Sequence, residues 1–229
     1  MRFPTRLIAL LALGAAGSAG GLAAQVRFLP VRNAGVGTGI GIAADVGFPN
    51  GDARKGIAVG ATGAIGLGPL GVTGQVGTWN PTGPGGSVSG AGVTGNLKII
   101  GGPLIPLSVT LQAGAAYDKE SGNSIEGDAF DVKRWHVPVG VGLALTIPNP
   151  VFSIKPWLAP RVDVTRTTTS DGGTASQATD TQTKFGISGG VDLGFLSGLA
   201  VRVMYDRVNM GNHVTPAVLS LGLGFKVGT

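Results

Sequence analysis

Few side chains in this chain of 229 residues could do chemistry. No residue is Cys, so disulfides, thiolate metal ligands and a cysteine nucleophile are excluded. The two histidines each follow acids in the sequence: His136 comes after Asp118 and Asp131, and His213 comes after Asp206. Because a carboxylate can orient a histidine as a general base, either group could support hydrolysis. A histidine at a solvated edge needs no such role, and we predict that the protein is not an enzyme.

A run of acids offers the other candidate site. The acids are Asp118, Glu120, Glu126, Asp128 and Asp131. Their carboxylates could hold a divalent cation, but their spacing matches no calcium-binding loop. The Gly-rich segment 35–41 is followed by no predicted helix, so it is not a phosphate-binding loop. We therefore predict no catalytic, metal-binding or cofactor-binding residue, and no cofactor.

The N-terminal residues 1–24 have the pattern of a secretory signal peptide. Arg2 and Arg6 precede the short apolar run 7–16, and small residues then lead to cleavage after Ala23 or Ala24. An anchor helix is the alternative, but it needs roughly 20 continuous apolar residues. We predict an exported protein whose domain covers residues 25–229. The formal net charge of +5 is small and scattered, which excludes nucleic acid as a partner.

The rest of the chain alternates apolar residues with small or polar ones, at the two-residue period of β-strands. In segment 185–195 one face carries only Phe, Ile, Val, Leu and Gly, and the other carries Gly, Ser and Asp. A tilted membrane strand needs roughly 9 to 11 residues, whereas soluble strands average about 5 to 6. The pattern predicts ten strands of membrane length, near 37–48, 57–67, 71–79, 87–100, 106–117, 134–147, 153–167, 184–195, 198–208 and 216–227.

The connections alternate between long polar loops and tight turns, as in a barrel with short periplasmic turns and longer outer loops. We therefore predict an all-β fold, a transmembrane antiparallel up-and-down β-barrel of ten strands. Eight strands are the alternative if the Gly-rich region 71–100 is not fully strand. A secreted β-sandwich would also alternate, but its polar face would carry Lys, Glu and Thr rather than Gly, Ala and Ser.

Charged residues are expected to avoid the lipid-facing side, where Lys or Arg at mid-depth costs about 2–4 kcal/mol. Arg166 and Arg207 have outward parity but belong to the outer rim. Strand parity places other charges inside, where small residues on neighbouring strands leave them room. This predicted lumen charge network consists of Asp45, Lys98, Lys155, Arg161, Asp163, Asp192, Arg202, Asp206 and Lys226. Because buried charges need partners, we expect the network to fill the barrel.

Aromatic residues sort toward the two ends of the strands, as in the girdles of membrane barrels. The outer girdle is predicted at Phe48, Tyr117, Trp135, Phe185 and Tyr205, and the periplasmic girdle at Phe152, Phe195 and Phe225. Trp79 breaks the parity of its strand, which indicates a bulge or a register shift there. Trp157 is predicted to point inward.

The pattern resembles that of the small outer-membrane β-barrel family, the group of the OmpA transmembrane domain and OmpX-like proteins. Segment 218–227 is similar to the C-terminal strand through which the barrel assembly machinery recognises such proteins, although this chain continues past Phe225. The resemblance implies the outer membrane of a Gram-negative-type cell, with lipids and lipopolysaccharide as surroundings. Proteases of the omptin type pair two acids with an Asp–His pair at the rim, and here Asp52 stands alone in the corresponding early loop.

Together these features predict an outer-membrane barrel with a structural or surface-interaction role and a largely filled lumen. A narrow passive pore for small polar solutes is the alternative, and a rim hydrolase is a distant third. The polar loops 118–134 and 168–183 are the segments expected to meet any extracellular ligand.

Overall fold

A computed structural model describes residues 38–50, 53–82, 86–102, 105–123, 129–171, 177–209 and 215–227. The predicted signal peptide, His213, Glu126 and Asp128 lie outside these residues. Within them, no helix is long and apolar enough to cross a membrane. Ten long strands account for nearly all of the described chain: β1 Gly39–Pro49, β2 Gly56–Leu67, β3 Leu70–Pro81, β4 Val88–Gly102, β5 Ile105–Asn123, β6 Ala129–Leu145, β8 Phe152–Asp171, β9 Gln177–Phe195, β10 Leu199–Asn209 and β11 Ala217–Val227. The two-residue β7, Ile147–Pro148, follows β6 and pairs with β8.

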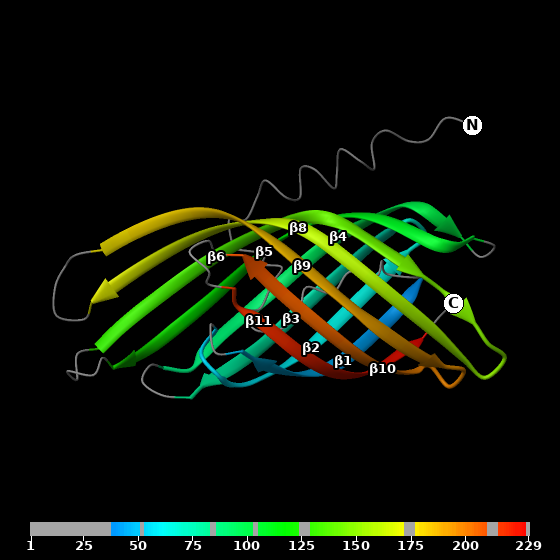
Figure 1. The fold of residues 1–229 in the computed structure, drawn as a ribbon, viewed down its shortest axis with the longest axis horizontal. Helices are drawn as coiled ribbons and strands as arrows, with labels where there is room; N and C mark the ends of the chain where they lie inside the picture. The colour runs from blue at the N-terminus through cyan, green and yellow to red at the C-terminus, as the bar shows by residue number, and fades with distance from the viewer. Residues whose placement is uncertain are drawn as a thin grey trace.

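These strands form one closed antiparallel barrel (Figure 1). Each long strand pairs with its neighbour in the chain, β1 pairs with β11, and β6 pairs with β8 across the short β7. The predicted ten-stranded up-and-down barrel is therefore confirmed, and the eight-stranded alternative is wrong. The Gly-rich region 71–100 forms strands β3 and β4, which pair from Leu70–Leu97 to Trp79–Val88; among its described residues, 82, 86 and 87 connect them.

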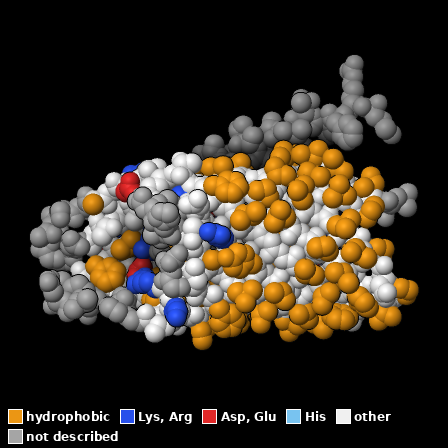
Figure 2. Space-filling model, in the orientation of Figure 1, with side chains coloured by type: hydrophobic (Ala, Val, Ile, Leu, Met, Phe, Trp, Pro, Cys, Tyr) orange, Lys and Arg blue, Asp and Glu red, His pale blue; other side chains and the backbone are white. Residues whose placement is uncertain are grey.

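The barrel is apolar outside and polar inside, the reverse of a water-soluble protein. In β11 the side chains of Leu219, Leu221 and Leu223 are exposed, while Ser220 between them is buried. Figure 2 shows apolar side chains gathered along most of the barrel, with Lys, Arg, Asp and Glu side chains beyond them toward one end. We call this surface the apolar belt; across β6 it runs from Trp135 to Leu145. A β-sandwich would bury these side chains against each other, so the exposed belt rules that fold out.

Most of the residues predicted for the aromatic girdles have side chains exposed on the surface of the barrel. Phe48, Trp135, Phe185 and Tyr205 are exposed toward one edge, and Phe195 and Phe225 are exposed toward the other. Tyr117 and Phe152 are half-buried. The Tyr117 ring lies 5.0 Å from that of Trp135, between centroids.

Four strands continue well beyond the belt. β5, β6, β8 and β9 have 17 to 20 residues, whereas β1, β2, β3, β10 and β11 have 11 or 12. Their ends project together as one sheet (Figure 1). We call this sheet the outer wall, residues 118–123, 129–134, 167–171 and 177–184, and we call its end of the barrel the long-strand end. The opposite, short-turn end carries the tight turns at 68–69 and 196–198.

The outer wall corrects the prediction that 118–134 and 168–183 are loops. Pairing of β5 with β6 continues to Asn123–Ala129, and pairing of β8 with β9 continues to Ser170–Gln177. In β8 and β9 both faces of the extension are polar, so the alternation of apolar and polar residues that marks a strand is absent there.

The expected bulge at Trp79 is wrong as well. Trp79 pairs in regular register with Ala58 and Val88, and its ring is buried inside the barrel against both. Its large aromatic side chain has the inward parity of its strand, so no shift is needed. The register irregularity of this region instead lies in β4, between Lys98 and Gly102.

Candidate functional site

The centre of the lumen holds a buried ion cluster around Arg161 of β8. Its Nε donates to Asp163 Oδ2 at 2.9 Å, and its Nη1 and Nη2 donate to the two Asp206 carboxylate oxygens, each at 2.9 Å. Nη1 also donates to Ser188 Oγ at 2.7 Å. The Arg161 side chain is 0% exposed. Both carboxylates therefore share one cation, and the group ties β8 to β10 across β9.

Glycines on the neighbouring strands make this arrangement possible. A Cβ on Gly186 would lie 2.7 Å from Asp163 Oδ2 and 2.9 Å from Arg161 Cζ. Likewise, a Cβ on Gly222 would lie 2.7 Å from Cδ of Arg202. The long side chains thus pass directly over bare backbone, as the small inner residues of the sequence suggest.

Asp45 and Arg202 occupy the neighbouring sector of the lumen, on β1 and β10. Both side chains are buried, and the space above Gly222 of the intervening β11 lies within van der Waals reach of each. Asp45 Oδ2 accepts a hydrogen bond from Thr62 Oγ1 at 3.0 Å. The predicted network residues of β1, β8 and β10 are therefore brought to adjoining positions on the inner surface.

A second ion cluster, which we call the mouth cluster, lies inside the barrel toward the long-strand end, and the strand pattern of the sequence does not predict it. Arg134 of β6 donates from Nη1 to Asp118 Oδ1 at 3.0 Å and from Nη2 to Glu120 Oε2 at 2.8 Å. Arg54, from the connection between β1 and β2, donates to the other oxygen of Glu120 and lies over the Trp79 ring at 5.0 Å. Because β2 and β5 are three strands apart in the barrel, the Arg54–Glu120 contact spans the part of the mouth beside β3 and β4.

His136 belongs to the same mouth cluster. Its Nε2 lies 2.7 Å from Asp118 Oδ2, and its Nδ1 lies 3.2 Å from Thr165 Oγ1. The Asp118 side chain is 0% exposed, so the prediction that it lies in an outer loop is wrong. Carrying the alternation of β5 two and four residues past Ala116 would have placed Asp118 and Glu120 inside.

Glu120 lies beyond the apolar belt, and its surroundings act on its ionisation in opposite directions. Burial disfavours the charged carboxylate, but the hydrogen bonds and positive charges of Arg134 and Arg54 outweigh that effect. The pKa of Glu120 is therefore held below its usual range.

At the short-turn end the charges are sparser. Lys155 and Asp192 are directly opposite each other on β8 and β9, and Asp192 Oδ1 accepts a hydrogen bond from Trp157 Nε1 at 3.3 Å. Trp157 is buried, as predicted. Lys98 is half-buried, and Lys226 is exposed near the end of β11. Lys226 therefore departs from the predicted filled lumen, because its side chain is exposed.

Uncharged side chains line the opposite wall of the lumen, on β3, β4 and β5. Gln75, Asn96 and Gln112 are 5–7% exposed, and Asn96 is directly opposite Gln112. Within the described residues, Gln75 Nε2 and both polar atoms of the other two amides have no hydrogen-bond partner. In the central lumen, charged side chains thus lie on β1, β8 and β10 and amides on β3, β4 and β5, the amide-lined half; Lys98 of β4 and Asp118 and Glu120 of β5 lie toward the two ends.

Comparisons with known proteins found similar solved structures but no related sequence. No protein-family model matches the sequence, and no curated protein matches it. The transport unit of the autotransporter AIDA-I from Escherichia coli superposes with a TM-score of 0.49 at 11% identity, covering 100% of each chain. The translocator domain of the autotransporter NalP from Neisseria meningitidis gives 0.45 at 13%, covering 84% of this chain and 90% of that one. Ail, the attachment invasion locus protein of Yersinia pestis, gives 0.37 at 12%, covering 83% and 100%. These likenesses include small outer-membrane barrels, as the strand pattern predicted, and they concern the fold alone.

Within the described residues, no group of three or more His, Asp or Glu side chains is arranged to hold a metal ion. The acids predicted to cluster in one loop separate instead. Asp118 and Glu120 face the lumen, whereas Asp131 lies on the outer face of the wall, paired with Lys119 at 2.9 Å.

Proposed function

We propose that the protein is an outer-membrane barrel with a structural or surface-interaction role and a lumen closed by charged side chains. The apolar belt supports residence in a bilayer, because it exposes large aliphatic residues that would be costly in water. The observation that carries the closed lumen is the mouth cluster, in which Arg54 reaches across to Glu120 and Arg134. The Arg161 cluster forms a second barrier deeper inside.

The test combines localisation with conductance. Full-length protein expressed in a Gram-negative host should fractionate with the outer membrane and migrate differently on gels before and after heating. In planar bilayers it should give small current steps or none. Large, steady steps of the kind general porins give would reject the closed lumen.

A narrow passage for small polar solutes is a second candidate, favoured by the amide-lined half of the lumen. The unpartnered groups of Gln75, Asn96 and Gln112 could each bond a passing neutral solute. Swelling of proteoliposomes in small sugars or urea measures this directly. Uptake that falls when Asn96 and Gln112 are both replaced by Leu would support the passage, and uptake no faster than in protein-free vesicles would exclude it.

A hydrolase remains the third candidate, and one geometric observation favours it. Asp118, His136 and Thr165 are joined in the order carboxylate, imidazole and hydroxyl that activates a nucleophile. In that role Thr165 Oγ1 would attack an ester, with His136 as the base. Ester hydrolysis by the folded protein should then disappear in both the His136→Ala and the Thr165→Val variants, and equal rates in wild type and His136→Ala would dismiss the hydrolase.

A further inference from the structure

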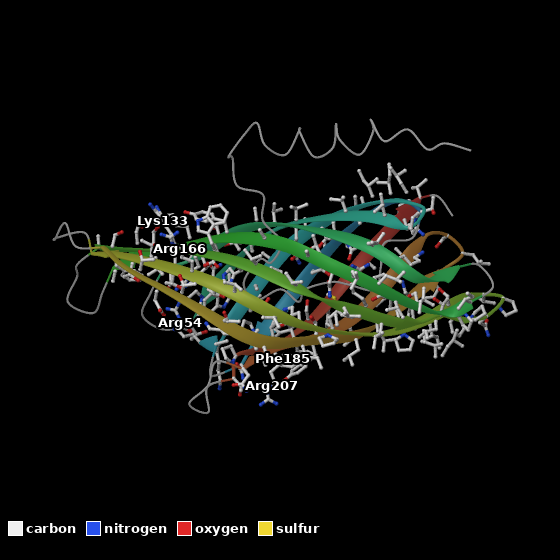
Figure 3. The ribbon with its side chains drawn as sticks, turned by 90° about the horizontal axis from the view of Figure 1, so that it is seen from above. Arg54, Lys133, Arg166, Phe185 and Arg207 are labelled. Atoms are coloured by element: carbon white, nitrogen blue, oxygen red, sulfur yellow. The ribbon has the colours of Figure 1, made fainter. Side chains whose placement is uncertain are left out.

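The outer face of the barrel carries three cations at the long-strand edge of the apolar belt and just beyond it. Lys119 of β5 and Lys133 of β6 are directly opposite each other and share the outward parity of Tyr117 and Trp135. Arg166 of β8 is directly opposite Trp135, one step diagonally from Lys133. Figure 3 shows Lys133 and Arg166 near each other, farther toward the long-strand end than Phe185 and Arg207.

This grouping is unfavourable unless an anion compensates it, because like charges directly opposite on one face of a sheet destabilise the pair. Asp131 forms a 2.9 Å ion pair with Lys119 and also interacts electrostatically with Lys133, so this one carboxylate compensates only part of the three positive charges. Within the described residues, Lys133 and Arg166 form no ion pair, and both side chains are exposed. Two cations on adjacent strands therefore remain for an external anion.

Hydroxyl groups surround these cations. Thr168 is directly opposite Lys133, and Thr181 is directly opposite Arg166. The Thr168 hydroxyl lies 3.4 Å from that of Thr179, so the three threonines form one patch on the outer face. Hydroxyl donors beside Lys and Arg suit phosphate oxygens, which accept several charge-assisted hydrogen bonds at once.

The layers below the cations match the rest of a lipid molecule. The paired rings of Tyr117 and Trp135 come next, and Val137, Val139 and Val164 follow as exposed aliphatic surface. Phosphate donors, aromatic rings and aliphatic side chains thus follow one another in the order of headgroup, interface and acyl chain. We propose that Lys133, Arg166 and the flanking threonines bind the phosphorylated headgroup of a lipid in the outer leaflet, of the lipid A type. This assignment rests on the proposed membrane orientation.

The barrel offers a matched control. Arg207 of β10 is also an exposed, outward-facing cation near the edge of the belt, but its cross-strand neighbours are Ile187 and Ala217, not a second cation. If basic residues only attracted anionic lipid in general, replacing Arg207 would weaken lipid binding as much as replacing Lys133 or Arg166. With a specific site it would not.

The experiment measures lipid A bound to the folded full chain in detergent, by native mass spectrometry. Wild type and Arg207→Gln should bind bisphosphorylated lipid A about tenfold or more tightly than Lys133→Gln plus Arg166→Gln, as expected for lost charge-assisted contacts. Lipid A stripped of its phosphates should bind all three equally weakly. Inorganic phosphate at millimolar concentration should not displace the lipid.

Each contrary result has a distinct meaning. Equal binding by all three proteins, or an equal loss in Arg207→Gln, overturns the site. Displacement by inorganic phosphate overturns the assignment to a lipid. Heat-modifiable migration and outer-membrane fractionation are recorded for every variant. If the wild type shows neither heat-modifiable migration nor outer-membrane fractionation, the proposed function is wrong. If it shows both, and lipid A binding does not change on replacing Lys133 and Arg166, only the proposed lipid site is wrong.

Discussion

At the scale of single residues, the most consequential feature is the buried guanidinium of Arg161. It is the shared partner of Asp163 and Asp206, and all three side chains are removed from solvent. Taking away one member of such a group leaves the others as uncompensated buried charges. The complete cluster adds little to the free energy of unfolding, but removing one of its members lowers that free energy strongly.

Replacing Arg161 by Met should therefore destabilise the barrel by about 3–5 kcal/mol, because both carboxylates lose their partner. The measurement is the urea midpoint of unfolding in lipid vesicles, followed by tryptophan fluorescence. Arg207→Gln, which alters an exposed arginine, should change stability by less than about 0.5 kcal/mol. Similar midpoints for the two variants would contradict the buried cluster.

The depressed pKa of Glu120 predicts a pH dependence of its own. A carboxylate whose folded pKa lies below its unfolded value stabilises the fold above the unfolded pKa, and it loses that contribution as pH falls through the folded one. Unfolding midpoints should therefore decline in acid below the usual glutamate range. Glu120→Gln should flatten that part of the profile. A profile unchanged by this substitution would show that the contacts of Arg54 and Arg134 are not coupled to Glu120 ionisation.

The sequence was informative about residues wherever a strand had already been recognised. Asp45, Arg161, Arg202 and Asp206 were placed inside by parity, and their side chains are buried. Asp118 and Glu120 were misplaced, because the strand was ended at Tyr117. Arg54 could not have been assigned to the mouth from its neighbours in sequence, since it reaches Glu120 over 66 positions.

At the scale of elements, the strands within the belt follow from their own residues, whereas the outer wall does not. A strand between lipid and lumen must alternate, because its two faces meet different surroundings. Above the belt both faces of β8 and β9 are polar, and the run of Thr, Ser and Asp is indistinguishable from a loop by pattern. Pairing with the opposite strand, which is a non-local property, keeps these residues extended.

The wall should accordingly be dispensable for the barrel itself. Deleting 169–178 and joining Thr168 to Thr179 through Asn-Gly, a favoured hairpin turn, removes the tip of the β8–β9 hairpin while sparing the belt. This variant should still insert and show heat-modifiable migration. A deletion of equal length within the belt, 184–193, should abolish both properties. Failure of the shortened hairpin to fold would show that the wall is needed to nucleate or hold the barrel.

At the scale of the whole molecule, the barrel has two unlike ends. The short-turn end is compact, and the long-strand end carries the wall and the mouth cluster. An outer-membrane barrel places its short turns in the periplasm, so the wall should face the outside of the cell. The absence of Cys makes this orientation simple to examine.

Single cysteines at Thr179 and at Ser197 should respond differently to a membrane-impermeant maleimide. Both positions are exposed, the first on the wall and the second in the turn between β9 and β10. In intact cells only Thr179→Cys should be labelled, and both should be labelled once the outer membrane is permeabilised. Preferential labelling of Ser197→Cys in intact cells would mean that the barrel is inserted the other way up.

The wall rises over only one part of the circumference, on the neighbouring strands β5, β6, β8 and β9. Among the described residues, the strands on the other side of the barrel end much closer to the apolar belt, so the rim is high on one side and low on the other; these strands are β1, β2, β3, β10 and β11. The outer wall would sterically block a large ligand, such as an antibody fragment or a phage fibre, that approached from the side of β5, β6, β8 and β9. Such a ligand would reach Arg54 and the mouth only by coming in over the low side, so direction of approach, as much as affinity, should decide what can dock there.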